Sequence, residues 1–372
     1  MFRNPIYGFC MVLFPVLVII FFTSLMDDGQ PADMPVGVVD HDHTATSRQL
    51  IRRLDALQTS KVVAHYANVN EARQAMQRNE IYAFLFIPHG TTTGLATSTQ
   101  PKISFYYNNV YLLAGSLTFR DLKTVATLGS AGVGRLKLLM AGKTEGEIRQ
   151  FLQPIVVDLH MTGNPWSNYN VYLSTTMIPG VLMLFVFLLT PYSIGTELKF
   201  KRSKEWIQMA GGNIHLAIAG KLLPQTFIFT LIMLGYEYYV FYVLGFPHPG
   251  GALPIMLLGV LGVLACQSFG IFVFGLMPSL RMSMSICSLW GVVSFSVCGA
   301  TFPVFAMDSF IESVAELFPL RHYYMIYQIC IFNGYPLADA VWNFCVLLAF
   351  LLLPMLTIRH IKTAMIKYVY IP

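Results

Sequence analysis

Residues 197–224, ELKFKRSKEWIQMAGGNIHLAIAGKLLP, form the longest polar interruption in the apolar second half of the chain. Apolar runs long enough to cross a bilayer flank this stretch, and it contains five basic residues: Lys199, Lys201, Arg202, Lys204 and Lys221. The positive-inside bias holds such a short basic loop on the cytoplasmic side. Within it, Ser203–Met209 can form about two helical turns before Gly211 and Gly212 end them. We therefore expect a cytoplasmic loop over residues 195–221.

The short helix in this loop has two interpretations. In the first, Trp206 and Met209 are exposed at the membrane surface, where a soluble partner binds them. In the second, the segment is an ordinary solvated connector between two spanning helices. These residues by themselves favour neither interpretation.

Composition indicates an integral membrane protein. The 372 residues are 55% hydrophobic and only 12% charged, whereas soluble domains carry about 25% charge. Residues 27–170 nevertheless hold 25 of the 43 Asp, Glu, Lys and Arg, and residues 238–280 hold none. One soluble domain is therefore inserted into a membrane protein. The remaining basic residues lie mostly at helix ends, so the net charge of +5 does not indicate a nucleic-acid partner.

Six apolar segments are long enough to span a bilayer. The first, residues 6–26, has no charge and no small-residue cleavage site, so residues 1–26 are predicted to be an uncleaved signal-anchor. Residues 171–372 supply the other five, at 171–194, 222–246, 252–277, 282–305 and 340–358. Both termini then lie in the cytoplasm and residues 27–170 outside it. Ten Lys and Arg fall in the short inside segments, and only Arg321 falls in a short outside loop.

The insert has the pattern of a small α/β domain. Strands are predicted at residues 35–39, 61–66, 81–87 and 103–107, and helices at 46–57 and 145–152. Another helix is expected to begin at an Asn70 cap, and residues 91–101 are expected to form a loop. After Tyr111 the pattern is helical, with a break expected between Gly129 and Gly134. The predicted fold is thus six transmembrane helices with an extracytoplasmic α/β domain between the first two.

A second interrupted segment lies between the fifth and sixth spans. Residues 308–333 are too polar to span, and Pro319 divides them into two short helices. We expect residues 306–338 to form a helical hairpin that lies in the outer interface or dips into the membrane. A plain amphipathic loop is the alternative.

Several motifs match those of one known family. In the cytoplasmic loop they are Glu197, Glu205 and the Gly-Lys-Leu-Leu-Pro run at 220–224. Near the second interrupted segment they are Phe-Pro-Val at 302–304, Phe-Pro-Leu-Arg-His-Tyr-Tyr at 318–324 and Asn-Gly at 333–334. In the insert they are Val-Val-Asp at 38–40, Asp42 and Ser-Arg-Gln-Leu at 47–50. With these motifs in this order, the chain resembles the ABC-2-type transporter permeases with a large extracytoplasmic domain after the first helix.

The match covers nearly the whole chain, with two departures. Ser203 and Lys204 replace the usual Gly-Thr before the second acidic residue, and the family's amphipathic N-terminal helix is nearly absent. The resemblance implies an ATPase-coupling segment and a conserved outer hairpin. The coupling residues would be Lys204, Glu205, Trp206, Gln208 and Met209. The hairpin residues would be Pro319, Arg321, Tyr323 and Tyr324.

The resemblance also implies the permease half of an ATP-driven exporter in the bacterial inner membrane. Its substrate would be apolar or amphipathic, such as a drug or a lipid. Its partners would be an ABC ATPase, a second permease copy or paralogue, and membrane lipid. A periplasmic membrane-fusion adaptor and an outer-membrane duct are further partners that this family architecture accommodates.

The residues support a separate ATPase chain. A P-loop requires Gly-x-x-x-x-Gly-Lys-Ser/Thr. The run at 142–144 has Lys137 where the first glycine is required, and the run at 220–221 has His215 there. We therefore expect no catalytic residue and no cofactor on this chain, with ATP and Mg²⁺ bound by the partner.

Two other groups of residues could form a site. The His41, Asp42 and His43 run could ligate a metal, but it lies at a strand-to-helix turn that favours a capping role, and no metal site is predicted. Glu237 is the one formally charged residue in a predicted span. Its place among tyrosines, roughly 24 Å along the helix from Lys221, indicates the outer aromatic belt, where its carboxylate reaches water. It is a candidate pathway residue.

Two other classes of protein remain as alternatives. A proton-coupled secondary transporter usually buries several carboxylates or histidines at mid-membrane, and here only Glu237 qualifies. A membrane-anchored extracytoplasmic sensor requires a cytoplasmic output domain, and only residues 359–372 follow the last span. All six cysteines lie in or beside membrane segments, which indicates packing roles.

Topology can be tested by cysteine labelling. Cysteines introduced between residues 40 and 160 should react with a membrane-impermeant thiol reagent in intact spheroplasts, whereas one at Ser203 should react only after permeabilisation. The reverse pattern would contradict the six-helix topology. The native cysteines should give a low background because all lie in or beside membrane segments.

Overall fold

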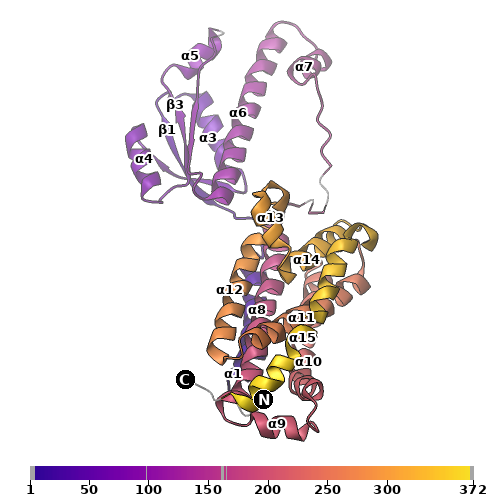
Figure 1. Ribbon diagram of the computed structural model, residues 1–372. Helices are drawn as coiled ribbons and strands as arrows, with labels where there is room; N and C mark the ends of the chain where they lie inside the picture. The colour runs from indigo at the N-terminus through magenta and orange to yellow at the C-terminus, as the bar shows by residue number, and fades with distance from the viewer. Residues whose placement is uncertain (1–4, 98, 161–162, 165, 369–372) are drawn as a thin grey trace. The chain divides into compact units, whose positions relative to one another are not determined.

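The computed structural model describes residues 5–97, 99–160, 163–164 and 166–368 (Figure 1). The chain divides into two compact units. The helical unit comprises Met1–Gly29 and Met161–Pro372, and the α/β unit comprises Gln30–His160.

Within the described residues, the helical unit contains six helices long and apolar enough to span a membrane, as predicted. The first combines α1 (Pro5–Gly8), η1 (Phe9–Leu13) and α2 (Phe14–Leu25). The others are α8 (Tyr169–Lys199), α10 with η2 (Ile214–Tyr238, Tyr239–Val243), α11 (Ala252–Leu276), α12 (Leu280–Val297) and η5 with α15 (Leu337–Ala340, Val341–Lys367).

Helices α8 and α11 form the centre of this unit. Most of their residues are buried, and α8 packs against α2, α11 and α12 while α11 also packs against α15. Small residues bring these helices together. Gly270 of α11 lies against Thr190, and Gly180 of α8 lies against Phe295 of α12, so a Cβ at either glycine would collide with its neighbour. Glycines that allow such close approach are typical of membrane helix bundles.

Several predicted spans have different limits in the structure. Helix α8 ends at Lys199 rather than at residue 194, and α15 ends at Lys367 rather than at residue 358. Helix α10 begins at Ile214, eight residues before the predicted start, because the Asn213 side chain accepts a hydrogen bond from the His215 N–H. Helix α12 ends at Val297, well before the predicted residue 305. Gly299 has φ +96° and Pro303 follows, and neither conformation continues a helix.

Short helices fill the two interrupted segments. The first holds α9 (Ser203–Met209), and the second holds η3 (Val304–Ala306), α13 (Ser309–Ala315), α14 (Pro319–Ile326) and η4 (Tyr327–Phe332). The predicted division at Pro319 is confirmed, because this proline is the first residue of α14. Figure 1 shows α9 and α13 at opposite ends of the helix bundle.

The α/β unit is built on a four-stranded sheet in the order β2-β1-β3-β4. The central strands β1 (Met34–Asp40) and β3 (Ala83–Ile87) are parallel, as are β1 and β2 (Ser60–His65). Strand β4 (Ser104–Tyr107) runs antiparallel to β3. The apolar runs of β1 and β3 are continuous because both faces of these strands are buried.

Helices cover both faces of this sheet. On one face, α3 (Ala45–Asp55) and α6 (Leu112–Met140) pack through Leu54 and Leu122 against Val36 and Leu85. On the other face, α4 (Val69–Gln77) contributes Ala72 and Ala75 beside Phe84. Helices α5 (Thr91–Ala96) and α7 (Glu145–Leu152) complete the unit.

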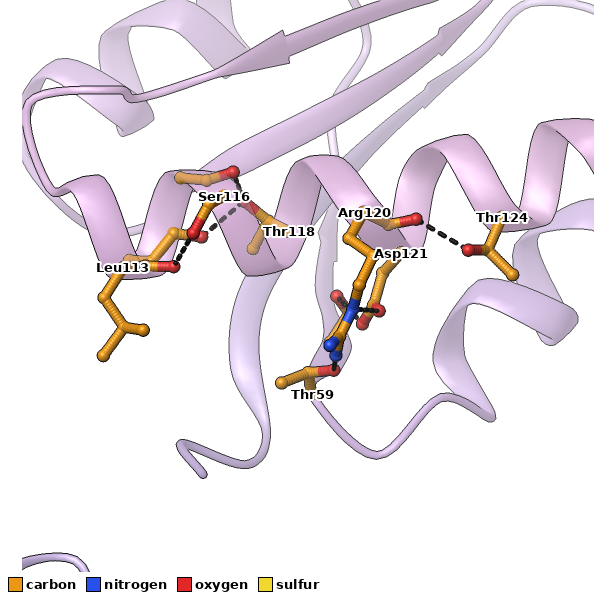
Figure 2. A network of polar contacts seen from close by, with 10 residues as sticks. Thr59, Leu113, Ser116, Thr118, Arg120, Asp121 and Thr124 are labelled. Atoms are coloured by element: carbon orange, nitrogen blue, oxygen red, sulfur yellow. Dashed lines mark hydrogen bonds and ion pairs between the residues drawn. The ribbon is translucent and has the colours of Figure 1, made fainter. Parts of the chain in front are cut away.

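A buried polar network joins α6 to the start of β2 (Figure 2). The Asp121 carboxylate accepts a hydrogen bond of 2.8 Å from the Ser60 hydroxyl. The Arg120 guanidinium lies 3.7 Å from the same carboxylate and donates to the Thr59 hydroxyl at 3.4 Å. The buried charge of Asp121 thus has both a hydrogen-bond donor and a cation.

Three predictions for this unit were wrong. Asn68, rather than Asn70, caps α4 by accepting from the Glu71 N–H. The loop expected at residues 91–101 contains α5. Helix α6 also continues through the expected break, because Gly129 provides room for Leu50 and Gly134 provides room for Leu152. These glycines allow close packing inside a helix rather than ending it.

Stability of the α/β unit should depend on the Leu54 side chain. Leu54→Ala should lower its unfolding free energy by about 2–5 kcal/mol, because Leu54 is 0% exposed and the substitution leaves a cavity. Leu128→Ala is the matched control, because Leu128 is 52% exposed, and its cost should stay within about 0.5 kcal/mol. Pulse proteolysis of the purified chain in urea measures both, and equal shifts would contradict the assigned core.

Candidate functional site

Helix α9 is held between the ends of three longer helices. It contacts α8, α10 and α15. The chain enters it through Lys201, which has φ +58°, and leaves it through Gly211 and Gly212, which have φ +63° and +79°. Glycine adopts this left-handed backbone conformation without steric cost, and the two successive glycines turn the chain from α9 into α10.

Trp206 is buried, contrary to the first of the two interpretations, in which it is exposed. Its side chain is 8% exposed and, with Ile207, belongs to an apolar cluster formed with Ile194 of α8 and Ile361 and Met365 of α15. A seven-residue helix has only one buried face, and the largest apolar side chain gains most from occupying it. Trp206 therefore anchors α9 to its own chain.

The opposite face of α9 is open and amphipathic. Lys204, Glu205 and Gln208 are exposed, and Met209 is 75% exposed. Phe200, just before α9, is 62% exposed, with the Lys199 ammonium 5.9 Å from its ring centroid. We call Phe200, Lys204, Glu205, Gln208 and Met209 the α9 surface. The sequence-predicted coupling residues except Trp206 lie on it.

Polar contacts fix α9 to its neighbours. The Ser203 hydroxyl donates to the Met365 carbonyl oxygen at 2.7 Å, and the Lys362 ammonium donates to the Gly212 carbonyl oxygen at 2.7 Å. An ion pair between Glu197 and Lys221 joins the adjoining ends of α8 and α10. The sequence did not predict this role of α15: Lys362 is one of the ten Lys and Arg of the predicted inside segments and served only to predict the orientation in the membrane. Because Ser203 is buried, Met209 is the better position for topology labelling.

The second interrupted segment contains a polar cluster centred on Glu316. Its carboxylate accepts from the Arg321 Nε and the Trp342 Nε1, both at 2.9 Å. The fully buried His322 ring lies 2.8 Å from the Glu316 carbonyl oxygen and 2.9 Å from the Asn343 Oδ1. Glu316 links α13, α14 and α15, and sequence reasoning did not select it.

The environment of Glu316 keeps it charged. Burial raises the pKa of this carboxyl group, but the Trp342 and Arg321 hydrogen bonds and the neighbouring cations outweigh burial and lower the pKa below the usual value for glutamate. Because the folded-state pKa is lowered, the cluster stabilises the fold above the pKa of an unfolded glutamate. That stabilisation is lost as the pH falls through the folded-state pKa.

The four predicted hairpin residues are all buried. Pro319 begins α14, and Arg321 is paired with Glu316. Tyr323 lies against Gly262 of α11, and the Tyr324 hydroxyl accepts from Gln328 at 2.8 Å. These residues attach α14 to the bundle, and none presents a free surface.

Glu237 does not reach water, contrary to the prediction. It is 3% exposed, and neither carboxylate oxygen has a hydrogen-bond partner among the described residues. The carboxylate lies directly on Gly259 of α11, where a Cβ would collide with both oxygens. Of the tyrosines that flank it in the sequence, Tyr236 is buried, whereas Tyr238 and Tyr242 are exposed.

The turn that holds His41, Asp42 and His43 has a local structural role. The Asp42 Oδ2 accepts from the Thr44 and Thr92 hydroxyls at 2.8 and 2.6 Å and from the Thr92 N–H at 3.1 Å. Burial by itself raises the pKa of Asp42, but these hydrogen bonds together outweigh burial and lower the pKa below the usual value for aspartate. The contacts join the turn that follows β1 to the start of α5, the helix that follows β3.

Comparison with known families gives one match. A family model described as ABC-2 family transporter protein matches residues 6–358, which is nearly the whole chain. No curated protein matches the chain.

The burial of Trp206 predicts a specific effect on α9. Trp206→Ala removes an aromatic anchor worth about 3–5 kcal/mol in a core, so local opening should increase. Hydrogen–deuterium exchange of residues 203–212 should accelerate by about a hundredfold or more. Met209→Ala should leave exchange unchanged, because Met209 has no buried contact to lose. Equal exchange in the two variants would contradict the anchoring role of Trp206.

Proposed function

The chain belongs to the ABC-2 transporter family, and from this membership we propose that it is the permease subunit of an ATP-driven exporter. It would move an apolar or amphipathic substrate, such as a drug or lipid, out of the cytoplasm or the inner membrane. ATP and Mg²⁺ would be bound by a separate ABC ATPase, so the chain itself would carry no catalytic residue.

The observation that carries this proposal is the geometry of α9. A coupling element must present a surface to its partner and must be rigidly connected to the helices that move. The α9 surface meets the first requirement, with Phe200 and Met209 as apolar anchors beside Lys204, Glu205 and Gln208. Exposed apolar anchors with a polar rim are typical of protein interfaces.

The contacts behind α9 meet the second requirement. Trp206 packs against α8 and α15, the Ser203 and Lys362 hydrogen bonds fix α9 to α15, and the ion pair between Glu197 and Lys221 joins α8 to α10. A displacement of α9 by the ATPase would therefore be shared by three spanning helices. This coupling requires only rigid-body movement of packed elements.

The remaining assembly follows from the same proposal. Two permease copies, or one copy and a paralogue, would form the translocation unit in surrounding lipid in a bacterial inner membrane. Both termini and α9 would be cytoplasmic, and residues 27–170 would be extracytoplasmic, where a membrane-fusion adaptor leading to an outer-membrane duct could bind them. A secondary transporter would instead move substrate on a proton gradient without any ATPase.

Association with the ATPase should depend on Met209. Met209→Asp should reduce copurification of the ATPase by about tenfold or more, because an apolar interface anchor is typically worth about 2 kcal/mol. Met140→Asp is the matched control, since Met140 is 86% exposed but lies in the α/β unit. Both variants should insert normally.

Activity gives a second readout for the same variants. The purified chain alone should not hydrolyse ATP, and the complex should. Undiminished ATPase recovery and transport in Met209→Asp would contradict docking at the α9 surface. Transport that persists on a proton gradient without the ATPase would contradict the exporter proposal as a whole.

A further inference from the structure

The α/β unit places two parallel strands with diverging connections side by side. The chain leaves β1 through α3 toward β2 on one side, and it leaves β3 through α5 toward β4 on the other side. The carboxyl ends of β1 and β3 therefore form a topological switch point. In open α/β sheets, ligands bind in the crevice outside such a point. A binding site in this unit is thus expected at this edge of the sheet.

A cavity of about 120 Å³ lies at this edge, between α3, α5 and α6. Gly129 of α6 is part of its lining, and a Cβ there would lie 2.9 Å from the Leu50 Cδ1. Among the described residues that line the cavity, none is charged. The larger apolar side chains of the lining are all aliphatic: Leu50, Ile87, Leu95, Pro101, Ile103 and Val133.

Three hydroxyl side chains of the lining are held by contacts within the unit. The Ser47 hydroxyl donates to Asp40 at 2.7 Å, and the Thr92 hydroxyl donates to Asp42 at 2.6 Å. The Thr91 hydroxyl donates to a backbone carbonyl oxygen at 2.7 Å. Asp40, Asp42 and Ser47 belong to the motif that the insert shares with the family. These motif residues therefore fix two sides of the cavity, those formed by α3 and α5.

Two further hydroxyls of the lining are available to a ligand. Thr46 of α3 and Ser130 of α6 line the cavity, and among the described residues neither hydroxyl has a hydrogen-bond partner. By contrast, the Thr124 and Thr127 hydroxyls of α6 each donate to a backbone carbonyl oxygen of their own helix at 2.8 Å. The cavity thus combines an aliphatic lining with two unpartnered neutral polar groups.

We propose that this cavity binds a small neutral compound with one aromatic ring and one hydroxyl group, of which phenol is the simplest. The ring would occupy the aliphatic part, and its hydroxyl would form hydrogen bonds with the Thr46 and Ser130 hydroxyls. In another protein, an apolar cavity of about 150 Å³ holds benzene, so the volume here suits one ring. This inference goes beyond the proposed function, because it makes the α/β unit a ligand-binding module in its own right.

Other ligand classes fit the cavity less well. An anion would find no Lys, Arg or His in the lining, and a cation would find no carboxylate there. Among the described residues, no group of three or more His, Cys, Asp and Glu could hold a metal ion. A drug-sized compound typically requires a pocket of about 300 Å³ or more. Size and charge therefore favour a single neutral ring.

Direct binding tests the proposal. The full chain, without ATPase, is placed in phosphatidylcholine nanodiscs with 4-fluorophenol, and fluorine saturation-transfer NMR measures binding. Ala126→Leu places a larger side chain in the lining and should weaken binding tenfold or more. Thr127→Leu is the matched control, because this exposed neighbour on α6 is outside the lining, and it should bind as the wild type does. All samples contain the same lipid, so partition of the probe into the bilayer cancels.

The polar group of the ligand is tested with two more probes. The double variant Thr46→Val with Ser130→Ala should weaken 4-fluorophenol binding about fivefold, as expected for lost neutral hydrogen bonds. It should leave the binding of fluorobenzene, which has no hydroxyl, unchanged. The wild type should not bind 4-fluorobenzoate, a charged ring of similar size. Equal binding of 4-fluorobenzoate and 4-fluorophenol would contradict the assignment to neutral ligands.

Hydrogen–deuterium exchange of the wild-type chain provides a measurement that does not depend on a variant's folding. Addition of 4-fluorophenol should slow exchange of residues 91–96 and 126–133 beside the cavity, and not of α4 on the other face of the sheet. Unchanged exchange, or equal binding by wild type and Ala126→Leu, would overturn the proposal. Because these assays contain no ATPase, their failure leaves the Met209 test intact, and failure of that test leaves phenol binding measurable.

Discussion

Close contact between α8 and its neighbours α11 and α12 is the constraint on which the helical unit depends. Gly180 and Gly270 bring the helix axes together by accepting Phe295 and Thr190 into the space where a Cβ would be. Apolar packing in hydrocarbon gains little from water exclusion, so such shape matching carries much of the association. Helices α2, α10 and α15 are then arranged around this centre.

The position of α9 follows from that arrangement. The ends of α8, α10 and α15 leave an apolar surface at one end of the bundle, and Trp206 and Ile207 cover it. Once these two residues face inward, helical geometry places Lys204, Glu205, Gln208 and Met209 outward. One packing preference thus produces both a rigid connection and an exposed surface, which are the two properties required of a coupling element.

The helical unit contains two acidic side chains, Glu316 and Glu237, whose surroundings differ in whether they supply hydrogen-bond donors and cations to the carboxyl group. Glu316 is surrounded by Arg321, Trp342 and His322, so its charge stabilises the junction of α13, α14 and α15. Glu237 has only phenols, apolar side chains and the backbone of Gly259 around it. The fold therefore uses the first acid for its own stability, whereas the second is buried without a hydrogen-bond partner among the described residues.

Much of this architecture was predictable from the sequence. Hydropathy over about 20 residues identifies spanning helices because bilayer thickness sets their length, and alternating strand and helix patterns predicted the order of the α/β unit. Pro319 predicted a helix boundary because it begins α14, where its missing N–H costs nothing. These signals are local, and each reports a property of one segment.

Side-chain environment was not predictable in the same way. Trp206 looked exposed because a polar loop surrounds it in sequence, yet α8 and α15 bury it. Glu237 looked able to reach water because tyrosines flank it, yet it packs against Gly259 of α11 and is only 3% exposed. Gly129 was expected to break a helix, yet α6 continues through it and Leu50 packs where its side chain would be. In each case the deciding contact comes from a residue distant in the chain. The sequence alone determined the hydropathy and charge of each segment, and these properties located the helices and strands. Which side chains are buried or paired was decided only by the packing of the helices against one another.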